Sequence, residues 1–251
     1  MAAEGSTVYV ANPGGDTITP ISTAIGEPGQ PIVVGPSPDA MAVTPDGRTV
    51  LVLTSSGVTG VTPVDAATNR AGKPVAIQGA CALRVAPGGR TAYVLATPDP
   101  NSQQGFAVPV DIRAGTAGTP IKVGLTPVQI AFTPDGTMAY VANYASQSIT
   151  PIRLADGLAG PAIAAGKIPA GLAVSPDGTT VYVLDTNIFG GMGPGMPFGV
   201  QVRRLSGLLF SALVRKPFPV PGQVIPIRVP ANSAGRPIKV GRLPTAIAIA
   251  P

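Results

Sequence analysis

Several residue types are scarce in this sequence of 251 residues, and each scarcity excludes a class of site. There is no histidine, so this chain alone supplies no Ser-His-Asp triad, no Cys-His pair and no histidine-ligated zinc. Its single cysteine, Cys81, excludes an internal disulfide and leaves the redox compartment open. Tryptophan is absent and aromatic residues make up 4%, which leaves few groups to stack on bases. We therefore expect no sequence-specific binding of nucleic acid.

Long apolar runs are also missing. No run reaches the ~18 residues that a membrane-spanning helix needs, so the sequence predicts no transmembrane segment. The first ten residues, MAAEGSTVYV, contain neither a basic region nor an apolar core, so no signal peptide is expected.

Glycine and proline are abundant, at 32 and 30 residues, and they recur in phase. The turn Thr-Pro-Asp-Gly at 44–47 returns, with edits, at 86–89, 133–136 and 175–178, and 250–251 match its first half. Proline presets φ in such a turn and glycine accepts φ > 0, so each copy predicts a corner between two strands. A period of about 40 residues built from short β-type runs is typical of propeller blades.

Each repeat contains four short strands, as at residues 139–143, 148–152, 161–164 and 170–175. The predicted fold class is all-β: a single β-propeller domain, residues 1–251, of five four-stranded blades. The final residues LPTAIAIAP match the strand that elsewhere precedes the repeated turn, whereas the N-terminus matches the residues after it. The C-terminal strand is therefore expected to pair with the N-terminal strands and close the ring, giving a monomer without free sheet edges.

The repeated motifs resemble those of one known family. They are Tyr-Val-Ala-Asn at 9–12 and 140–143, Thr-Pro-Ile/Val at 19–21, 62–64 and 150–152, Pro-Ile-x-Val-Gly at 31–35, 120–124 and 237–241, and Thr-Pro-Asp-Gly. Together they resemble the YVTN-family β-propeller repeat of surface-layer and cell-envelope proteins. The resemblance implies an extracellular or cell-envelope location, no shared catalytic motif and no cofactor. Members of that family more often have about seven blades.

Length varies at one place in the repeat, the connection between the second and third strands of a blade. The largest change is an insertion at residues 188–222, in the last blade. Variable loops on one rim of a scaffold commonly form the binding site, so we expect the binding surface there. The insertion itself has two interpretations: a lid or surface element for an acidic partner or membrane interface, or a hairpin that packs against the rim.

Charge is unevenly distributed along the chain. The net charge is +5, but no acidic residue follows Asp185, whereas eight basic residues do. Such a sector attracts a protein or an anionic cell-envelope polymer, unless it is only a solvated basic face. The candidate binding residues are Arg84, Arg203, Arg204, Arg215, Lys216 and Arg242.

Two residues on predicted inner strands, Arg84 and Cys81, have two interpretations each. Arg84 takes a position that holds alanine in the other repeats, and it is interpreted either as an anion-binding group on the channel wall or as a snorkelling side chain. Cys81 is interpreted either as a reactive thiol or, preferably, as a small buried filler.

Acidic residues give no metal site. Three of them belong to the repeated turns: Asp46, Asp135 and Asp177. Asp16, Asp99, Asp185 and Asn187 lie in variable loops and carry oxygen ligands, but their spacing matches no calcium loop, so no metal is predicted.

Two functions of different class follow. The favoured one is a non-enzymatic binding scaffold that uses the loop face and the basic C-terminal sector. The alternative is a lactonase-like propeller hydrolase with an oxygen-ligated metal at the channel mouth. The absence of histidine and the presence of only two glutamates favour the scaffold.

Overall fold

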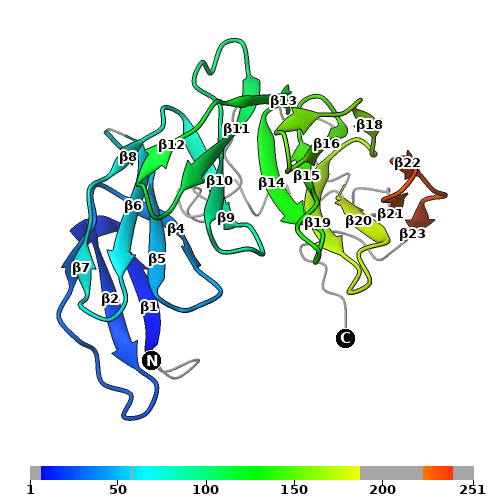
Figure 1. Cartoon of the computed structure of the whole chain (residues 1–251). Helices are drawn as coiled ribbons and strands as arrows, with labels where there is room; N and C mark the ends of the chain where they lie inside the picture. The colour runs from blue at the N-terminus through cyan, green and yellow to red at the C-terminus, as the bar shows by residue number, and fades with distance from the viewer. Residues whose placement is uncertain (1–6, 58, 187–222, 240–251) are drawn as a thin grey trace, which may run out of the picture.

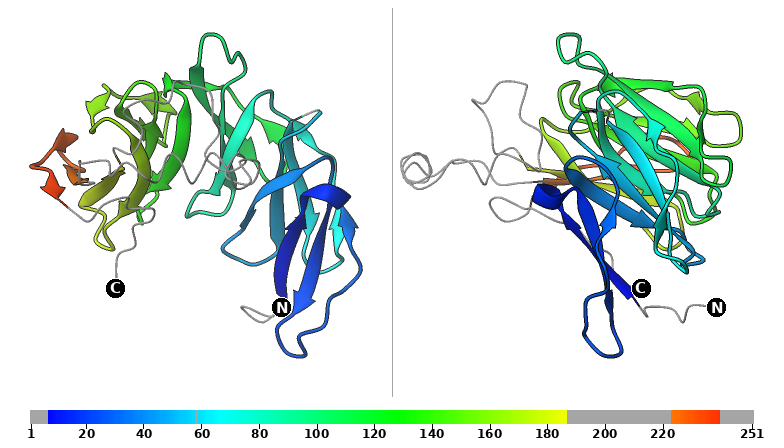
Figure 2. Two further views of the ribbon diagram at one scale, coloured as in Figure 1. Left: turned by 180° about the vertical axis from the view of Figure 1, so that it is seen from behind. Right: turned by 90° about the vertical axis from the view of Figure 1, so that its left-hand side faces the viewer.

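The computed structural model describes residues 7–57, 59–186 and 223–239. These residues form five antiparallel β-sheets and one short 3-10 turn, Pro13–Gly15. The prediction of an all-β propeller with five blades is confirmed. Figure 1 shows the blades following one another along an arc, with β1 to β3 at one end and β19 to β23 at the other, and Figure 2 shows the same arc from two further sides. The expected closing strand, at residues 243–251, lies outside the described residues.

The second blade shows the common plan. Its strands β4 (Pro38–Val43), β5 (Thr49–Thr54) and β6 (Gly60–Asp65) run antiparallel in chain order, and two short strands, β7 (Arg70–Ala71) and β8 (Val75–Ala76), both pair with β6. The fourth strand expected for each blade is thus split into two pieces.

The other blades follow this plan. The first described blade contains β1 (Thr7–Asn12), β2 (Thr17–Ser22) and β3 (Ile32–Val33). The third contains β9 (Ala80–Val85), β10 (Thr91–Ala96), β11 (Gln104–Asp111), β12 (Thr116–Ala117) and β13 (Ile121–Leu125). The fourth contains β14 (Pro127–Phe132), β15 (Met138–Asn143), β16 (Ser148–Arg153), β17 (Leu158–Ala159) and β18 (Ile163–Ala164). The fifth contains β19 (Pro169–Val174), β20 (Thr180–Asp185), β21 (Gln223–Arg228), β22 (Ser233–Ala234) and β23 (Ile238–Lys239).

The repeated Pro-Asp-Gly turns join the first and second strands of a blade, as predicted. Between β4 and β5 the hydroxyl of Thr44 donates to Asp46 at 2.6 Å, and the Arg48 N–H donates to the same carboxylate at 3.1 Å. Gly47 has φ of 68°, the left-handed conformation that glycine adopts without strain. Asp135 and Asp177 make equivalent bonds, so all three aspartates serve the turns.

A second repeated interaction, a backbone hydrogen bond between a proline and a glycine, explains the split outer strand; the sequence analysis did not predict it. The carbonyl of Pro63 in β6 accepts a hydrogen bond from the Gly72 N–H at 2.7 Å, and a Cβ on Gly72 would lie 3.2 Å from Cγ of that proline. The chain therefore bends around the proline ring between β7 and β8. The same proline–glycine pair occurs in all five blades: Pro20–Gly29, Pro63–Gly72, Pro109–Gly118, Pro151–Gly160 and Pro226–Gly235.

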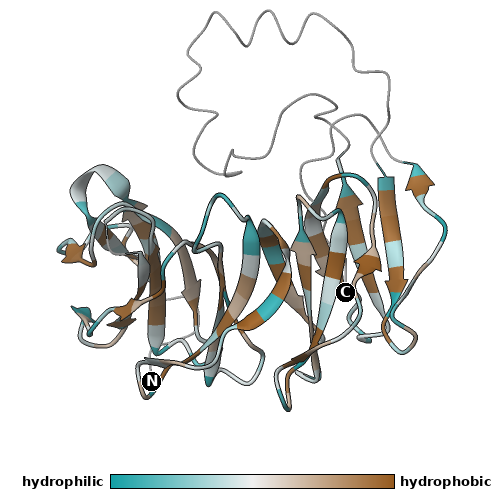
Figure 3. Cartoon of the chain, turned by 90° about the horizontal axis from the view of Figure 1, so that it is seen from above, coloured by the Kyte–Doolittle hydropathy of each residue, from teal (hydrophilic) through white to brown (hydrophobic). Residues whose placement is uncertain are grey.

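The core lies between the blades. Alternate residues of each second strand point to opposite faces of its sheet. In β5, Val50 and Val52 pack with Ile18 and other residues of the first blade, whereas Leu51 and Leu53 pack against the third blade. Two further clusters join the third blade to the fourth and the fourth to the fifth. Figure 3 shows apolar residues concentrated on the strands.

Candidate functional site

The variable loops lie beside the connections between blades, on the rim that the sequence predicted. The residue that follows the second strand donates its backbone N–H to a carbonyl of the connection that enters the same blade. These bonds are Ser55 to Ser37 at 3.2 Å, Thr97 to Gly79 at 2.9 Å, Tyr144 to Thr126 at 2.9 Å and Thr186 to Ile168 at 3.2 Å. Each loop on this rim, hereafter the loop rim, therefore starts from a fixed position.

The insertion starts and ends on this loop rim. Asp185, the last residue of β20, pairs directly with Gln223, the first residue of β21. The two strands that flank residues 188–222 in the chain are therefore paired in normal register. The insertion itself, and with it Arg203, Arg204, Arg215 and Lys216, lies outside the described residues, as does Arg242.

Buried polar side chains hold the loop rim in place. In the fourth blade the fully buried Asn143 donates from Nδ2 to the Thr150 hydroxyl at 2.9 Å and to the Ser148 carbonyl at 3.2 Å. Its Oδ1 accepts the Gly124 N–H at 3.1 Å, in β13 of the third blade. This one amide thus joins the end of β15 to β16 and to the preceding blade.

In the fifth blade, the carboxylate of Asp185 holds the end of the second strand against the connection that enters the blade. It is 3% exposed, and its oxygens accept the backbone N–H groups of Ile168 at 2.8 Å and Lys167 at 3.3 Å. Asp16 accepts the Ser37 N–H at 3.1 Å, and Asp99 accepts the Asn101 N–H at 2.9 Å. These three carboxylates belong to three different blades and shape their own loops. Within the described residues, no group of three or more cysteine, aspartate and glutamate side chains gathers in a way that could hold a metal ion.

Arg84 lies on the inner strand of the third blade. It is exposed and stands opposite Tyr93 in the β9–β10 register, on the face that packs toward the fourth blade. The corresponding alanines, Ala42, Ala131 and Ala173, are partly buried. No acidic group within the described part of the chain forms an ion pair with Arg84.

Cys81 matches the predicted buried filler only in part, because the residue as a whole is exposed whereas its sulfur is desolvated. A β-bulge lies at this position: Ala80 pairs with Ala96 and Ala82 with Leu95, which leaves Cys81 outside the ladder, as the same bulge leaves Asp39, Val128 and Ala170 in the other inner strands. Its sulfur nevertheless sits among strand ends, 3.3 Å from the carbonyl oxygen of Leu95 and 3.4 Å from that of Pro127. Desolvation raises the pKa of this thiol to about 12, so the group stays protonated and weakly nucleophilic at neutral pH.

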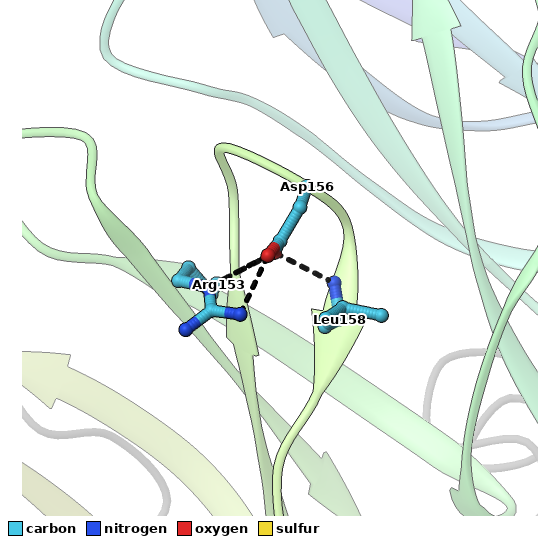
Figure 4. A network of polar contacts seen from close by, with 3 residues as sticks. All are labelled: Arg153, Asp156 and Leu158. Atoms are coloured by element: carbon cyan, nitrogen blue, oxygen red, sulfur yellow. Dashed lines mark hydrogen bonds and ion pairs between the residues drawn. The ribbon is translucent and has the colours of Figure 1, made fainter.

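The last blade carries exposed cations on its outer strands: Arg228, Arg236 and Lys239. None of them forms an ion pair with another described residue. The single ion pair in the described ranges joins Arg153 to Asp156 at 2.6 Å, in the turn before β17 (Figure 4). Asp156 also accepts the Leu158 N–H at 3.2 Å, so this pair closes a turn and leaves no anion site.

A shallow groove of about 670 Å³ lies at the outer edge of the first two blades. Its lining includes Gln30, Val33, Asn69 and Arg70, from the segments around β3 and β7. The hydroxyl of Tyr9 donates to Asn69 at 3.2 Å beside it. The lining includes neither Arg84 nor the residues of the loop rim, so this groove is not the predicted site.

Comparison with known proteins supports the fold and nothing finer. No family model matches the chain, and no curated protein matches it. Among solved structures, hydrazine synthase of Kuenenia stuttgartiensis is similar with a TM-score of 0.68 and 19% identity, over 95% of this chain and 64% of that chain. A functionally unknown protein from Desulfotomaculum acetoxidans is similar with a TM-score of 0.66 and 19% identity, over 94% of this chain and 67% of that chain.

This chain thus spans about two thirds of the length of either similar structure. The similarity supports the propeller fold, whereas the YVTN resemblance remains a prediction. No helix in the described ranges is long and apolar enough to cross a membrane.

Proposed function

We propose that this chain is a non-enzymatic binding scaffold whose partner contacts the loop rim and the basic last blade. One observation carries the proposal. The loops of this rim range from residues 144–147 in the fourth blade to residues 186–222 in the fifth, yet the same backbone hydrogen bond anchors the start of both. A fixed frame that tolerates such variation in one loop is typical of binding surfaces.

Charge narrows the class of partner. The last blade exposes Arg228, Arg236 and Lys239 without acidic partners among the described residues, and the insertion adds Arg203, Arg204, Arg215 and Lys216. Cations without counter-charges attract polyanions, and they do so most strongly at low ionic strength. We therefore propose an anionic polymer of the cell envelope as the partner, with Arg84 as a further contact on the channel wall.

Binding to linear polyphosphate tests this proposal. In the first variant, Arg203, Arg204, Arg215 and Lys216 are all changed to Gln; in the second, Arg228, Arg236 and Lys239 are. A matched control changes three exposed arginines of the second and third blades, Arg48, Arg70 and Arg113, to Gln. Fluorescence anisotropy at several salt concentrations gives the affinity and its salt dependence.

We expect the second variant to lower the slope of log affinity against log salt by about 2, because three phosphate contacts are lost at ~0.7 each. The control is expected to change the slope by less than half of that. Arg84→Ala is expected to weaken binding further. Equal losses in the control and the second variant would contradict the proposal, because binding would then follow net charge alone. Stoichiometric divalent metal in the purified protein, with hydrolysis of a lactone, would support the hydrolase instead.

A further inference from the structure

The four junctions between described blades follow one rule. The second and fourth residues of each second strand face the preceding blade, and they are fully buried there. At all four junctions these residues have an exposed fraction of 0%: Val50 and Val52, Ala92 and Val94, Ala139 and Val141, Val181 and Val183. Burying such side chains is the main apolar contribution of each junction.

The first blade breaks this rule. Its residues at the same positions, Val8 and Val10, are 51% and 41% exposed. Ile21 in β2 lies opposite Val8 in the register and is also partly exposed, whereas its equivalents are buried to 2% or less. We call this set the head face: Val8, Val10 and Ile21. It is the half of a junction that normally receives the preceding blade.

The last blade breaks the rule on its other side. Ile238 in β23 is 52% exposed, whereas three of its equivalents, Ile32, Val75 and Ile163, are 8% exposed because the next blade covers them; the fourth, Ile121, is partly exposed. Tyr182 and Val224 on the same side of the sheet are also partly exposed. We call this set the tail face: Tyr182, Val224 and Ile238. It is the half of a junction that normally receives the following blade.

The geometry points to a second copy of this chain as the occupant of each face. We infer that the tail face of one copy packs on the head face of another, in a head-to-tail contact that repeats the internal junctions. The two faces have the complementary residue positions that the chain joins four times within itself. Two head faces placed together would instead oppose positions that never meet in this structure. A contact of this kind is heterologous, so it can extend beyond a dimer.

Charge supports the same orientation. The described part of the first blade contains Asp16 and Glu27 and no lysine or arginine. The last blade exposes Arg228, Arg236 and Lys239. A head-to-tail contact therefore brings an acidic blade against a basic one, whereas two heads or two tails would place like charges together, which is unfavourable.

Two variants separate this contact from its alternatives. Val10→Asp damages only the head face, and Ile238→Asp damages only the tail face. Both residues are half-exposed within one chain, so the changes leave the fold of the single chain largely untouched. Leu158→Asp is the matched control, because Leu158 is 57% exposed and lies in β17 of the fourth blade, which contributes to neither end face. Mass is measured by light scattering after size exclusion, over a wide range of concentration.

Wild type and Leu158→Asp are expected to associate beyond one chain as concentration rises, and more strongly at low salt. Each single variant is expected to associate about a hundredfold more weakly, because an unpaired carboxylate would be buried at the contact. An equal mixture of Val10→Asp and Ile238→Asp is expected to form a dimer and nothing larger, because one intact head meets one intact tail.

Three outcomes would overturn the inference. Wild type that stays at the mass of one chain at every concentration would indicate that the chain covers its own end faces or leaves them free. Association of Ile238→Asp alone at wild-type strength would indicate a head-to-head contact. Failure of the mixture to form the dimer would contradict the pairing of head with tail. Circular dichroism of each variant shows whether it has folded.

Discussion

Asn143→Ala tests the claim that buried side-chain hydrogen bonds hold the loop rim. The asparagine is fully buried, and the change would leave the Gly124 N–H and the Thr150 hydroxyl without their partner. Each unsatisfied buried group costs about 1–3 kcal/mol. We expect the free energy of unfolding to fall by about 2–4 kcal/mol, which for a chain of this size lowers the midpoint of thermal unfolding by roughly 5–15 °C.

The third blade provides a compensating change. It has Ala96 where the fourth has Asn143, and Val108 where the fourth has Thr150. The third blade thus has an apolar pair where the fourth has a hydrogen-bonded one. Thr150→Val in the Asn143→Ala background should therefore restore about 1 kcal/mol, because it removes a hydroxyl that has lost its partner. Thr150→Val alone should destabilise, so the two changes should show a coupling of about 1–2 kcal/mol.

Urea unfolding followed by circular dichroism measures these free energies. Hydrogen exchange at Gly124 and Leu125 reports directly on the loop rim, and it should accelerate in Asn143→Ala. The matched control is Asn12→Ala, because Asn12 is only partly buried and, among the described residues, its side chain bonds those of Thr17 and Thr19. A loss below about 0.5 kcal/mol in Asn143→Ala, or an equal loss in the control, would refute the reasoning.

Three further predictions concern titratable groups. Tyr140→Phe removes a 2.9 Å hydrogen bond to Asn232 across a blade junction and should cost about 1 kcal/mol in urea unfolding. Desolvation raises the pKa of Tyr140 to about 12, so wild-type stability should fall as pH rises from about 10, the unfolded value, to about 12, and Tyr140→Phe should flatten that fall. Iodoacetamide at pH 8 should alkylate Cys81 about a thousandfold more slowly in folded than in urea-unfolded protein, measured by mass spectrometry; comparable rates would show that the thiol pKa is not raised. Hydrogen bonds from the Thr133 hydroxyl and then from Thr137 lower the pKa of Asp135. The stabilisation that the Asp135 carboxylate gives to the fold should therefore be present above pH ~4 and lost in more acidic solution. Acid titrations followed by circular dichroism should show a smaller loss in Asp135→Asn.

Much of the fold could be predicted because each blade repeats the same turn residues and the same alternation of apolar residues. Proline and glycine fix the corner at Pro45 and Gly47, and the alternating strand after it has only one register that buries Val50 and Val52. The position of the insertion could also be predicted, because a change in length between two strands of fixed register must fall in their connection.

Other features depend on the surroundings of a residue, which the sequence does not contain. Cys81 was predicted to be a buried filler, but it lies at a bulge where the residue is exposed and only its sulfur is desolvated. The proline–glycine hydrogen bond had a visible signal, a glycine nine residues after each strand proline, as with Pro63 and Gly72, which could have predicted the split outer strand. The exposure of Val8 and Val10 had no such signal, because their sequence matches that of buried strands and only the arrangement of the blades leaves them open.

The split outer strands bear on which surfaces of this molecule can recruit another chain. An uninterrupted strand at the perimeter of each sheet would offer a row of free backbone groups to any extended peptide. Here β3, β8, β18 and β23 are two residues long, and a proline precedes each within two positions, so in four blades the perimeter offers too short a template for strand addition, whereas β13 in the third blade is five residues long. Contact between copies then relies on the side chains of the head face and the tail face, and these residues determine whether two copies fit together.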